Sequence, residues 1–109
     1  MLKSADKNFY MRKTYMIIGR KSPPHSQKYE WEVDVSLDGN VKVSKQHALI
    51  VYNFDKGNFE AVCLSAKNPI KVNSKVVRVR DKPCTIYDAS KIEVGGVIFH
   101  FMLPQITNI

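Results

Sequence analysis

The chain has 109 residues, of which 44% are hydrophobic and 10% aromatic, and this supports one domain with its own core and excludes a largely disordered chain. Its formal net charge is +7 at pH 7, which favours polyanionic or phosphorylated partners and is equally compatible with a solvated, lysine-rich surface. No run is long and apolar enough to span a bilayer, and the N-terminus lacks the apolar core of a signal peptide. We therefore expect an intracellular protein without a membrane contact.

The cysteines and histidines show no metal-binding pattern. Cys63 and Cys84 lie far apart, without Cys-x-x-Cys spacing, each among apolar residues. We expect free thiols in a reducing compartment rather than a disulfide. His25, His47 and His100 show no ligand spacing to one another or to the cysteines. The sequence thus predicts no metal site and no cofactor.

One clear strand lies near the N-terminus. Residues 1–12 are mostly polar and predict either an edge strand or a tail. Residues 14–18 are apolar, β-branched and aromatic, and predict a strand that ends at Gly19. Arg20 follows where the chain leaves the sheet, and two consecutive prolines place a loop over residues 21–29.

The middle of the chain alternates between strand and turn signals. Apolar residues at every second position predict a half-buried strand over 31–36. Residues 38–40 form a tight-turn signal, and we expect residues 41–43 to be extended. Residues 44–47 then supply a hydroxyl, an ammonium and an imidazole directly before an apolar strand over 48–52. Such a cluster at a strand end can hold an anion.

The second half contains short apolar segments separated by turn residues. A hairpin loop over 53–58 and the pairs Asn73-Ser74 and Gly95-Gly96 are turn signals. The strands are expected at residues 59–64, 70–72, 75–79, 85–87, 92–94 and 97–102. No segment has a helical pattern. Many short strands at regular spacing predict an all-β sandwich or barrel.

Three predicted loops carry polar residues next to strands: Gly19-Arg20, residues 44–47 and Lys67-Asn68. Loops of a sandwich gather at its two ends. If these three share an end, an arginine, lysines, a hydroxyl and an amide surround one point. This set suits a phosphate, because arginine offers a planar fork of donors, the hydroxyl donates one hydrogen bond and lysine adds a point charge.

The order and spacing of these motifs resemble the fork head-associated (FHA) domain family. The resemblance runs from about Tyr15 to Phe101 and rests on Ile17-Ile18-Gly19-Arg20, Ser44-x-x-His47-Ala48, residues 65–74, and the closing segments 92–95 and 99–101. It implies a β-sandwich of two twisted sheets that binds phosphothreonine peptides through loops at one end. The predicted domain covers residues 13–103, between residues 1–12 and a C-terminal tail over 104–109.

The resemblance also implies roles for individual residues. Arg20 and Ser44 would contact the phosphate, and Lys45 stands where a basic or polar residue often assists. Asn68 would hold the peptide backbone on either side of the phosphothreonine, and Lys67, just before it, would add a contact.

Two further residues would support the site. Gly19 would permit the turn that presents Arg20, and His47 would bond across loops to hold Ser44. The chain departs from the family pattern where glycine is usual, at Pro69, at Ser74 and at the pair Ala89-Ser90.

The predicted function is a phosphothreonine-peptide recognition module that mediates phosphorylation-dependent protein–protein interaction. Within the family, the chain most resembles the FHA domains attached to fork head transcription factors. This likeness rests on the segment over residues 33–35 and on the lack of a catalytic partner in the chain. This implies nuclear signalling or transcription regulation, in the nucleus or the cytoplasm, by a monomer.

Two alternatives come from other classes. The run of basic residues Lys71, Lys75, Arg78, Arg80 and Lys82 suggests nucleic-acid binding, but no recognised motif accompanies it, so DNA contact is not favoured. A scaffold domain that binds independently of phosphorylation is the other alternative.

Catalysis is not expected. The chain has no nucleophile elbow and no Walker loop, and nothing evident would orient His47 toward Ser44 as a base.

Overall fold

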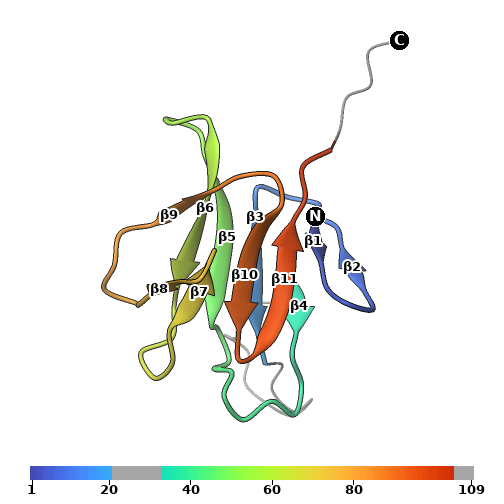
Figure 1. The fold of residues 1–109 in the computed structure, drawn as a ribbon, viewed down its shortest axis with the longest axis vertical. Helices are drawn as coiled ribbons and strands as arrows, with labels where there is room; N and C mark the ends of the chain where they lie inside the picture. The colour runs from blue at the N-terminus through green and yellow to red at the C-terminus, as the bar shows by residue number, and fades with distance from the viewer. Residues whose placement is uncertain (21–32, 105–109) are drawn as a thin grey trace.

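The computed structural model describes residues 1–20 and 33–104, which form eleven strands and no helix (Figure 1). The strands are β1 (Leu2–Lys3), β2 (Asn8–Phe9), β3 (Tyr15–Gly19), β4 (Val35–Ser36), β5 (Ala48–Asn53), β6 (Asn58–Cys63), β7 (Ile70–Val72), β8 (Lys75–Val77), β9 (Cys84–Ile86), β10 (Ser90–Val94) and β11 (Val97–Phe101). Among these residues no helix reaches the length and apolarity that a membrane crossing requires. The loop predicted over 21–29, the first residues of the strand predicted over 31–36, and the tail beyond Pro104 lie outside the described residues.

The strands form two sheets that pack as a sandwich, which confirms the predicted fold class. One sheet has the order β2-β1-β11-β10-β7-β8 and the other β4-β3-β5-β6-β9. Every described pair is antiparallel except β3 with β4, which is parallel. Strands β8 and β9 are therefore edge strands of different sheets, and the loop between them joins the two layers.

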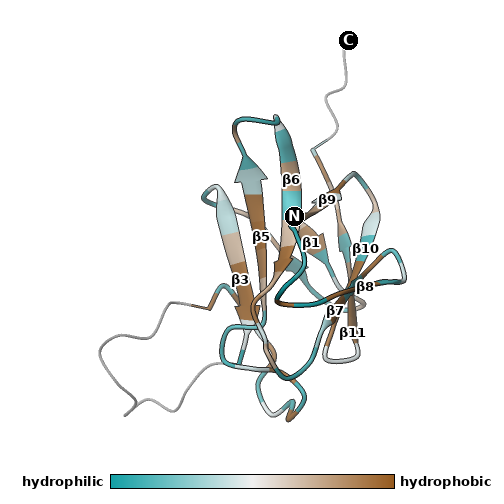
Figure 2. Ribbon diagram, turned by 90° about the vertical axis from the view of Figure 1, so that its left-hand side faces the viewer, coloured by the Kyte–Doolittle hydropathy of each residue, from teal (hydrophilic) through white to brown (hydrophobic). Residues whose placement is uncertain are grey.

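The core follows from the two-residue period of the strands. In β7, Ile70 and Val72 are buried while Lys71 is exposed, and in β10 every second residue, including Ile92 and Val94, is buried. Phe99 on β11 packs in the same cluster. In Figure 2 strands β3 and β5 are largely hydrophobic, and the loops at the ends of the sandwich are mostly hydrophilic. Burial of these apolar faces is the main stabilising contribution.

The N-terminal residues, for which the sequence left an edge strand or a tail open, belong to the six-stranded sheet. Strand β1 pairs with β11, with Leu2 opposite Phe101, and Leu2 is fully buried. The Met1 ammonium donates to the Met102 carbonyl over 3.0 Å, and the Met102 amide donates back to the Met1 carbonyl over 2.8 Å. The start of the chain is thus fixed against its last strand.

Tight turns keep left-handed backbone even where glycine is missing. The β7–β8 turn has φ of +49° at Asn73 and +72° at Ser74, and Ala89 before β10 has +67°. Positive φ at both central residues is typical of a two-residue hairpin turn. The Asn73 carboxamide oxygen accepts the amide of Lys91 over 2.8 Å and fixes the turn against β10. The turns keep this geometry at the expense of strain in Ser74 and Ala89.

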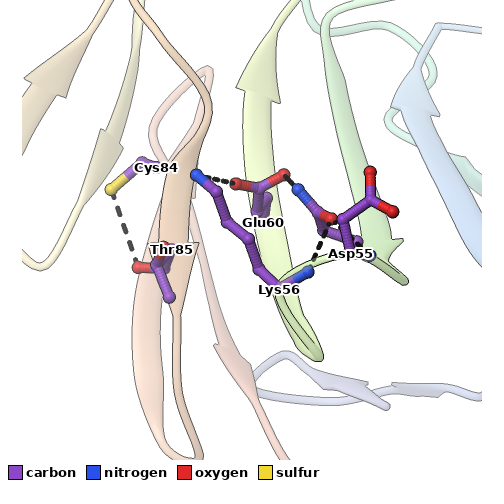
Figure 3. A network of polar contacts seen from close by, with 6 residues as sticks. Asp55, Lys56, Glu60, Cys84 and Thr85 are labelled. Atoms are coloured by element: carbon purple, nitrogen blue, oxygen red, sulfur yellow. Dashed lines mark hydrogen bonds and ion pairs between the residues drawn. The ribbon is translucent and has the colours of Figure 1, made fainter.

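The β5–β6 hairpin projects at one end of the sandwich (Figure 1), and a polar network orders its loop. The Asn53 side-chain oxygen accepts the amides of Asp55 and Lys56 over 3.0 and 3.1 Å. Its amide nitrogen donates to the buried carboxylate of Glu60 over 3.0 Å, and the Lys56 ammonium lies 3.8 Å from the other Glu60 oxygen (Figure 3). This loop is polar and ordered, and it lies far from the loops described below.

The prediction that residues 41–43 are extended was wrong. They belong to a turn that begins at Asn40, and the Val43 amide donates to the Asn40 carbonyl over 3.1 Å. The Asn40 side chain accepts the Lys42 amide over 3.0 Å and donates to the Gly95 carbonyl over 2.9 Å, so it competes with strand pairing. Val43 is buried against Gly95, where an added Cβ would lie 2.4 Å from the valine. Of the two valines, Val43 is therefore a buried anchor of the loop, whereas Val41 is 87% exposed.

Candidate functional site

Three polar segments meet at the end of the sandwich opposite the β5–β6 hairpin (Figure 1). Strands β3, β5 and β6 are consecutive antiparallel neighbours in one sheet, with Ala48 opposite both Ile18 and Cys63. The end of β3, the start of β5 and the end of β6 therefore share an edge. At this edge Arg20 follows β3, residues 44–47 precede β5, and the β6–β7 loop of residues 64–69 follows β6.

Gly19 is needed for space rather than for left-handed backbone, since its φ is not positive. A Cβ added there would lie 2.0 Å from the Lys45 carbonyl oxygen and 3.2 Å from the Ser44 carbonyl oxygen. The backbone of residues 44–45 thus lies directly on Gly19. The next amide, that of Arg20, donates to the Ser44 carbonyl over 3.2 Å, which fixes the two segments side by side.

His47 connects all three strand ends and is fully buried. Its amide donates to the Ile18 carbonyl over 2.9 Å, and its carbonyl accepts the Leu64 amide over 2.8 Å. Its ring Nδ1 accepts the Ser44 amide over 3.0 Å. The imidazole therefore holds the backbone that carries the Ser44 hydroxyl.

The hydrogen bond to Nδ1 defines the ring's charge state. Because Nδ1 is an acceptor, the proton of the neutral ring sits on Nε2, which is buried and has no hydrogen-bond partner among the described residues. Burial lowers the pKa of His47 below its usual value, although the backbone of Pro69 and Asn68 opposes this by favouring the charged ring. His47 is thus neutral near pH 7.

The Ser44 hydroxyl is oriented by a second serine. Its Oγ lies 2.7 Å from the Oγ of buried Ser65. Ser65 Oγ also accepts the amides of Lys67 and Asn68, each over 3.2 Å. A hydroxyl has two acceptor positions and one donor, so Ser65 must donate to Ser44. The Ser44 hydrogen then remains to donate to an anion.

The remaining polar residues lie on the loops that carry this serine pair or, for Arg20, on the segment bonded to Ser44. Asn68 is exposed, and its amide nitrogen donates to the Lys42 carbonyl over 3.0 Å, which ties the β6–β7 loop to the β4–β5 loop. Lys45 and Lys67 are exposed, and Arg20 is half-buried. Among the described residues no carboxylate pairs with the Arg20 side chain. The structure thus brings together all five residues that the sequence predicts for peptide binding, together with their two supporting residues.

Sequence reasoning missed Ser65 and the two anchors of the β4–β5 loop, Asn40 and Val43. Ser65 lay in a recognised motif, but its role depends on a contact with Ser44, 21 residues away.

Among residues 1–20 and 33–104, no three histidine, cysteine or acidic side chains are grouped so that they could hold a metal ion. Cys63 and Cys84 are free thiols. The loops bring cationic residues and an oriented hydroxyl donor to one end of the sandwich, and this donor set fits a multiply charged oxyanion.

Comparison with known proteins identifies the class of domain that this fold and site define. The sequence matches the FHA domain family over residues 16–95, so the chain belongs to that family. The pre-rRNA-processing protein FHL1 of Saccharomyces cerevisiae is 33% identical over 97 residues, covering 89% of this chain and 10% of FHL1. The fork-head transcriptional regulator FHL1 of Candida albicans is 32% identical over 97 residues, covering 89% of this chain and 8% of that protein. The chain therefore spans about a tenth or less of these two relatives.

The fold likeness extends to solved structures. One FHA domain, from a structural and functional analysis of phosphothreonine-dependent FHA domain interactions, superposes with a TM-score of 0.71. It is 18% identical, and the match covers 96% of each chain. The FHA sandwich is thus preserved at low sequence identity.

Proposed function

We propose that this domain is a phosphothreonine-peptide recognition module that mediates phosphorylation-dependent protein–protein interaction in nuclear signalling or transcription regulation. The observation that carries the proposal is the hydrogen-bond network that joins three loops and leaves the Ser44 hydroxyl free to donate beside Arg20. Relatives include a transcriptional regulator, and a similar fold was solved in a study of phosphothreonine-dependent interactions. Both agree with this role.

In this proposal the phosphate is held by convergent charge-assisted hydrogen bonds. Arg20 supplies a fork of N–H donors, Ser44 supplies one O–H donor and Lys45 adds positive charge. The Asn68 side-chain nitrogen donates one of its two N–H groups to the Lys42 carbonyl, so its second N–H and its oxygen remain to donate to and accept from the peptide backbone. Lys67 lies beside it and adds a further cation.

A binding role also has consequences for oligomeric state, catalysis and location. We propose a monomeric, non-catalytic domain without a cofactor, active in the nucleus or the cytoplasm. The division into residues 1–12, a domain over 13–103 and a tail over 104–109 stays a prediction.

The proposal is tested by the affinity of a phosphothreonine peptide for Arg20→Ala. Loss of one charged partner from a desolvated pair costs about 2–5 kcal/mol, so we expect binding at least about thirtyfold weaker. Arg12→Ala is the matched control, because Arg12 is exposed and precedes β3, whereas Arg20 follows it. Isothermal titration calorimetry should show wild-type affinity for the control, and wild-type affinity of Arg20→Ala would refute the site.

A further inference from the structure

A second cationic feature lies next to the loops of the candidate site. A groove of about 350 Å³ opens between the β6–β7 loop and the start of the β8–β9 loop, both on the left of Figure 1. We call it the basic groove, and its lining includes Ser65, Lys67, Pro69, Arg78, Val79 and Arg80. Its three cationic residues are exposed, and Val79 is 45% exposed between the two arginines.

The cations of the basic groove are not neutralised within the protein. Among the described residues, neither Lys67, Arg78 nor Arg80 forms an ion pair with a carboxylate. The acidic residue next in the chain, Asp81, instead accepts the backbone amide of Arg78 over 2.8 Å. Like charges around one concave surface repel one another, and an anion placed there relieves that repulsion.

The groove adjoins the candidate phosphate site through Ser65. Ser65, which lines it, lies one 2.7 Å hydrogen bond from the Ser44 hydroxyl. Arg20 follows β3 near one edge of the five-stranded sheet, whereas the β8–β9 loop leads from β8 to β9, the strand at the opposite edge of that sheet. An extended peptide advances about 3.3 Å per residue, so a chain held at Ser44 reaches the groove within a few residues.

We propose that the basic groove binds acidic side chains that flank the phosphothreonine, so that the preferred partner is an acidic phosphopeptide. This inference rests on the proposed phosphopeptide function and adds a specificity to it. Arg78 and Arg80 offer planar forks that match carboxylates, and Lys67 lines the same groove while its amide donates to Ser65, the partner of Ser44. Exposed Val79 supplies an apolar contact between the forks.

A peptide fits these observations better than a nucleic acid does. The basic run that suggested nucleic-acid binding is divided in the structure, since the Lys71 ammonium lies 3.8 Å from the Glu93 carboxylate on β10. Of the remaining cations of that run, Arg78 and Arg80 line a compact groove beside a hydroxyl donor, whereas a nucleic-acid backbone needs cations spread along its length.

The test compares phosphothreonine peptides that differ only in flanking charge. One has neutral flanks, and two others carry three acidic residues before or after the phosphothreonine. Each exposed ion pair strengthens binding only a few-fold, so two pairs should together make one acidic peptide about tenfold tighter at low salt. The double variant Arg78→Ala/Arg80→Ala should lose this gain and bind the neutral peptide like the wild type. The charge-matched control Lys7→Ala/Arg12→Ala should keep the gain.

Four results would overturn the inference, and they separate it from the proposed function. Equal affinities for acidic and neutral phosphopeptides, or a gain that survives in Arg78→Ala/Arg80→Ala, would reject the groove while leaving phosphothreonine binding intact. Binding of a DNA duplex that this variant abolishes would assign the groove to nucleic acid. Failure of every phosphothreonine peptide would reject both proposals.

Discussion

Replacing Gly19 with alanine probes the contact that fixes the candidate site. The new Cβ would lie 2.0 Å from the Lys45 carbonyl oxygen and 2.8 Å from its carbon, and both are backbone atoms that cannot rotate away. Ordinary contact begins at 3.4 Å, so the two backbones must separate by about 1.4 Å, the difference between those distances. The segment that moves carries the Ser44 hydroxyl.

Two effects should follow from this displacement. Overpacking of a close contact costs about 1–3 kcal/mol, which lowers the melting temperature of a domain of this size by about 5–20 °C. Moving Ser44 relative to Arg20 also weakens at least one charge-assisted hydrogen bond, each of which contributes about 1.5–3 kcal/mol. Peptide affinity should therefore fall about tenfold or more.

Thermal unfolding and calorimetric titration with a phosphothreonine peptide measure the two effects. Gly57→Ala is the matched control, because Gly57 has a φ of +66° and an added Cβ would meet nothing nearer than 3.8 Å. It lies in the β5–β6 loop, at the far end of the sandwich, so it should lose stability through strain but bind normally. Unchanged stability and affinity in Gly19→Ala, or an equal loss of affinity in Gly57→Ala, would refute the reasoning.

Three further predictions concern other parts of the fold. Ser74→Gly and Ala89→Gly should each raise stability by about 0.5–1 kcal/mol in thermal unfolding, because they relieve left-handed strain; a lower melting temperature would contradict this. Ser65→Ala should cost about 1–3 kcal/mol and weaken phosphopeptide binding, since two loop amides and the Ser44 hydroxyl lose their partner; wild-type affinity would reject its orienting role. Because burial lowers the pKa of His47, the unfolded chain takes up a proton that the folded chain does not, so the free energy of unfolding should fall by up to about 1.4 kcal/mol per unit as the pH drops below about 6.5. Urea titrations at several pH values should show this slope in the wild type and not in His47→Asn.

The longer strands could be predicted because each buries one face and shows the two-residue period within its own sequence. Strands β1 and β2 could not, since two residues have no period, and the burial of Leu2 arises from pairing with Phe101 at the other end of the chain. Val41 and Val43 had a strand-like spacing, but the side chain of Asn40 formed a turn instead.

The positions of the candidate site residues could be predicted from their motifs. Their connections could not, because each one joins distant segments: Ser65 to Ser44, Asn68 to the Lys42 carbonyl, and Gly19 to the Lys45 backbone. The same limit applied to the basic run, where pairing between strands β7 and β10 places Glu93 opposite Lys71. Sequence spacing does not contain this information.

The central claim is that the loop end of this sandwich recognises phosphothreonine. Its most direct test is fluorescence anisotropy with peptide libraries centred on phosphothreonine, phosphoserine or unmodified threonine, together with a random DNA duplex, at physiological salt. The account predicts binding confined to the phosphothreonine library. Equal binding of the unmodified library, or binding of the duplex alone, would contradict it.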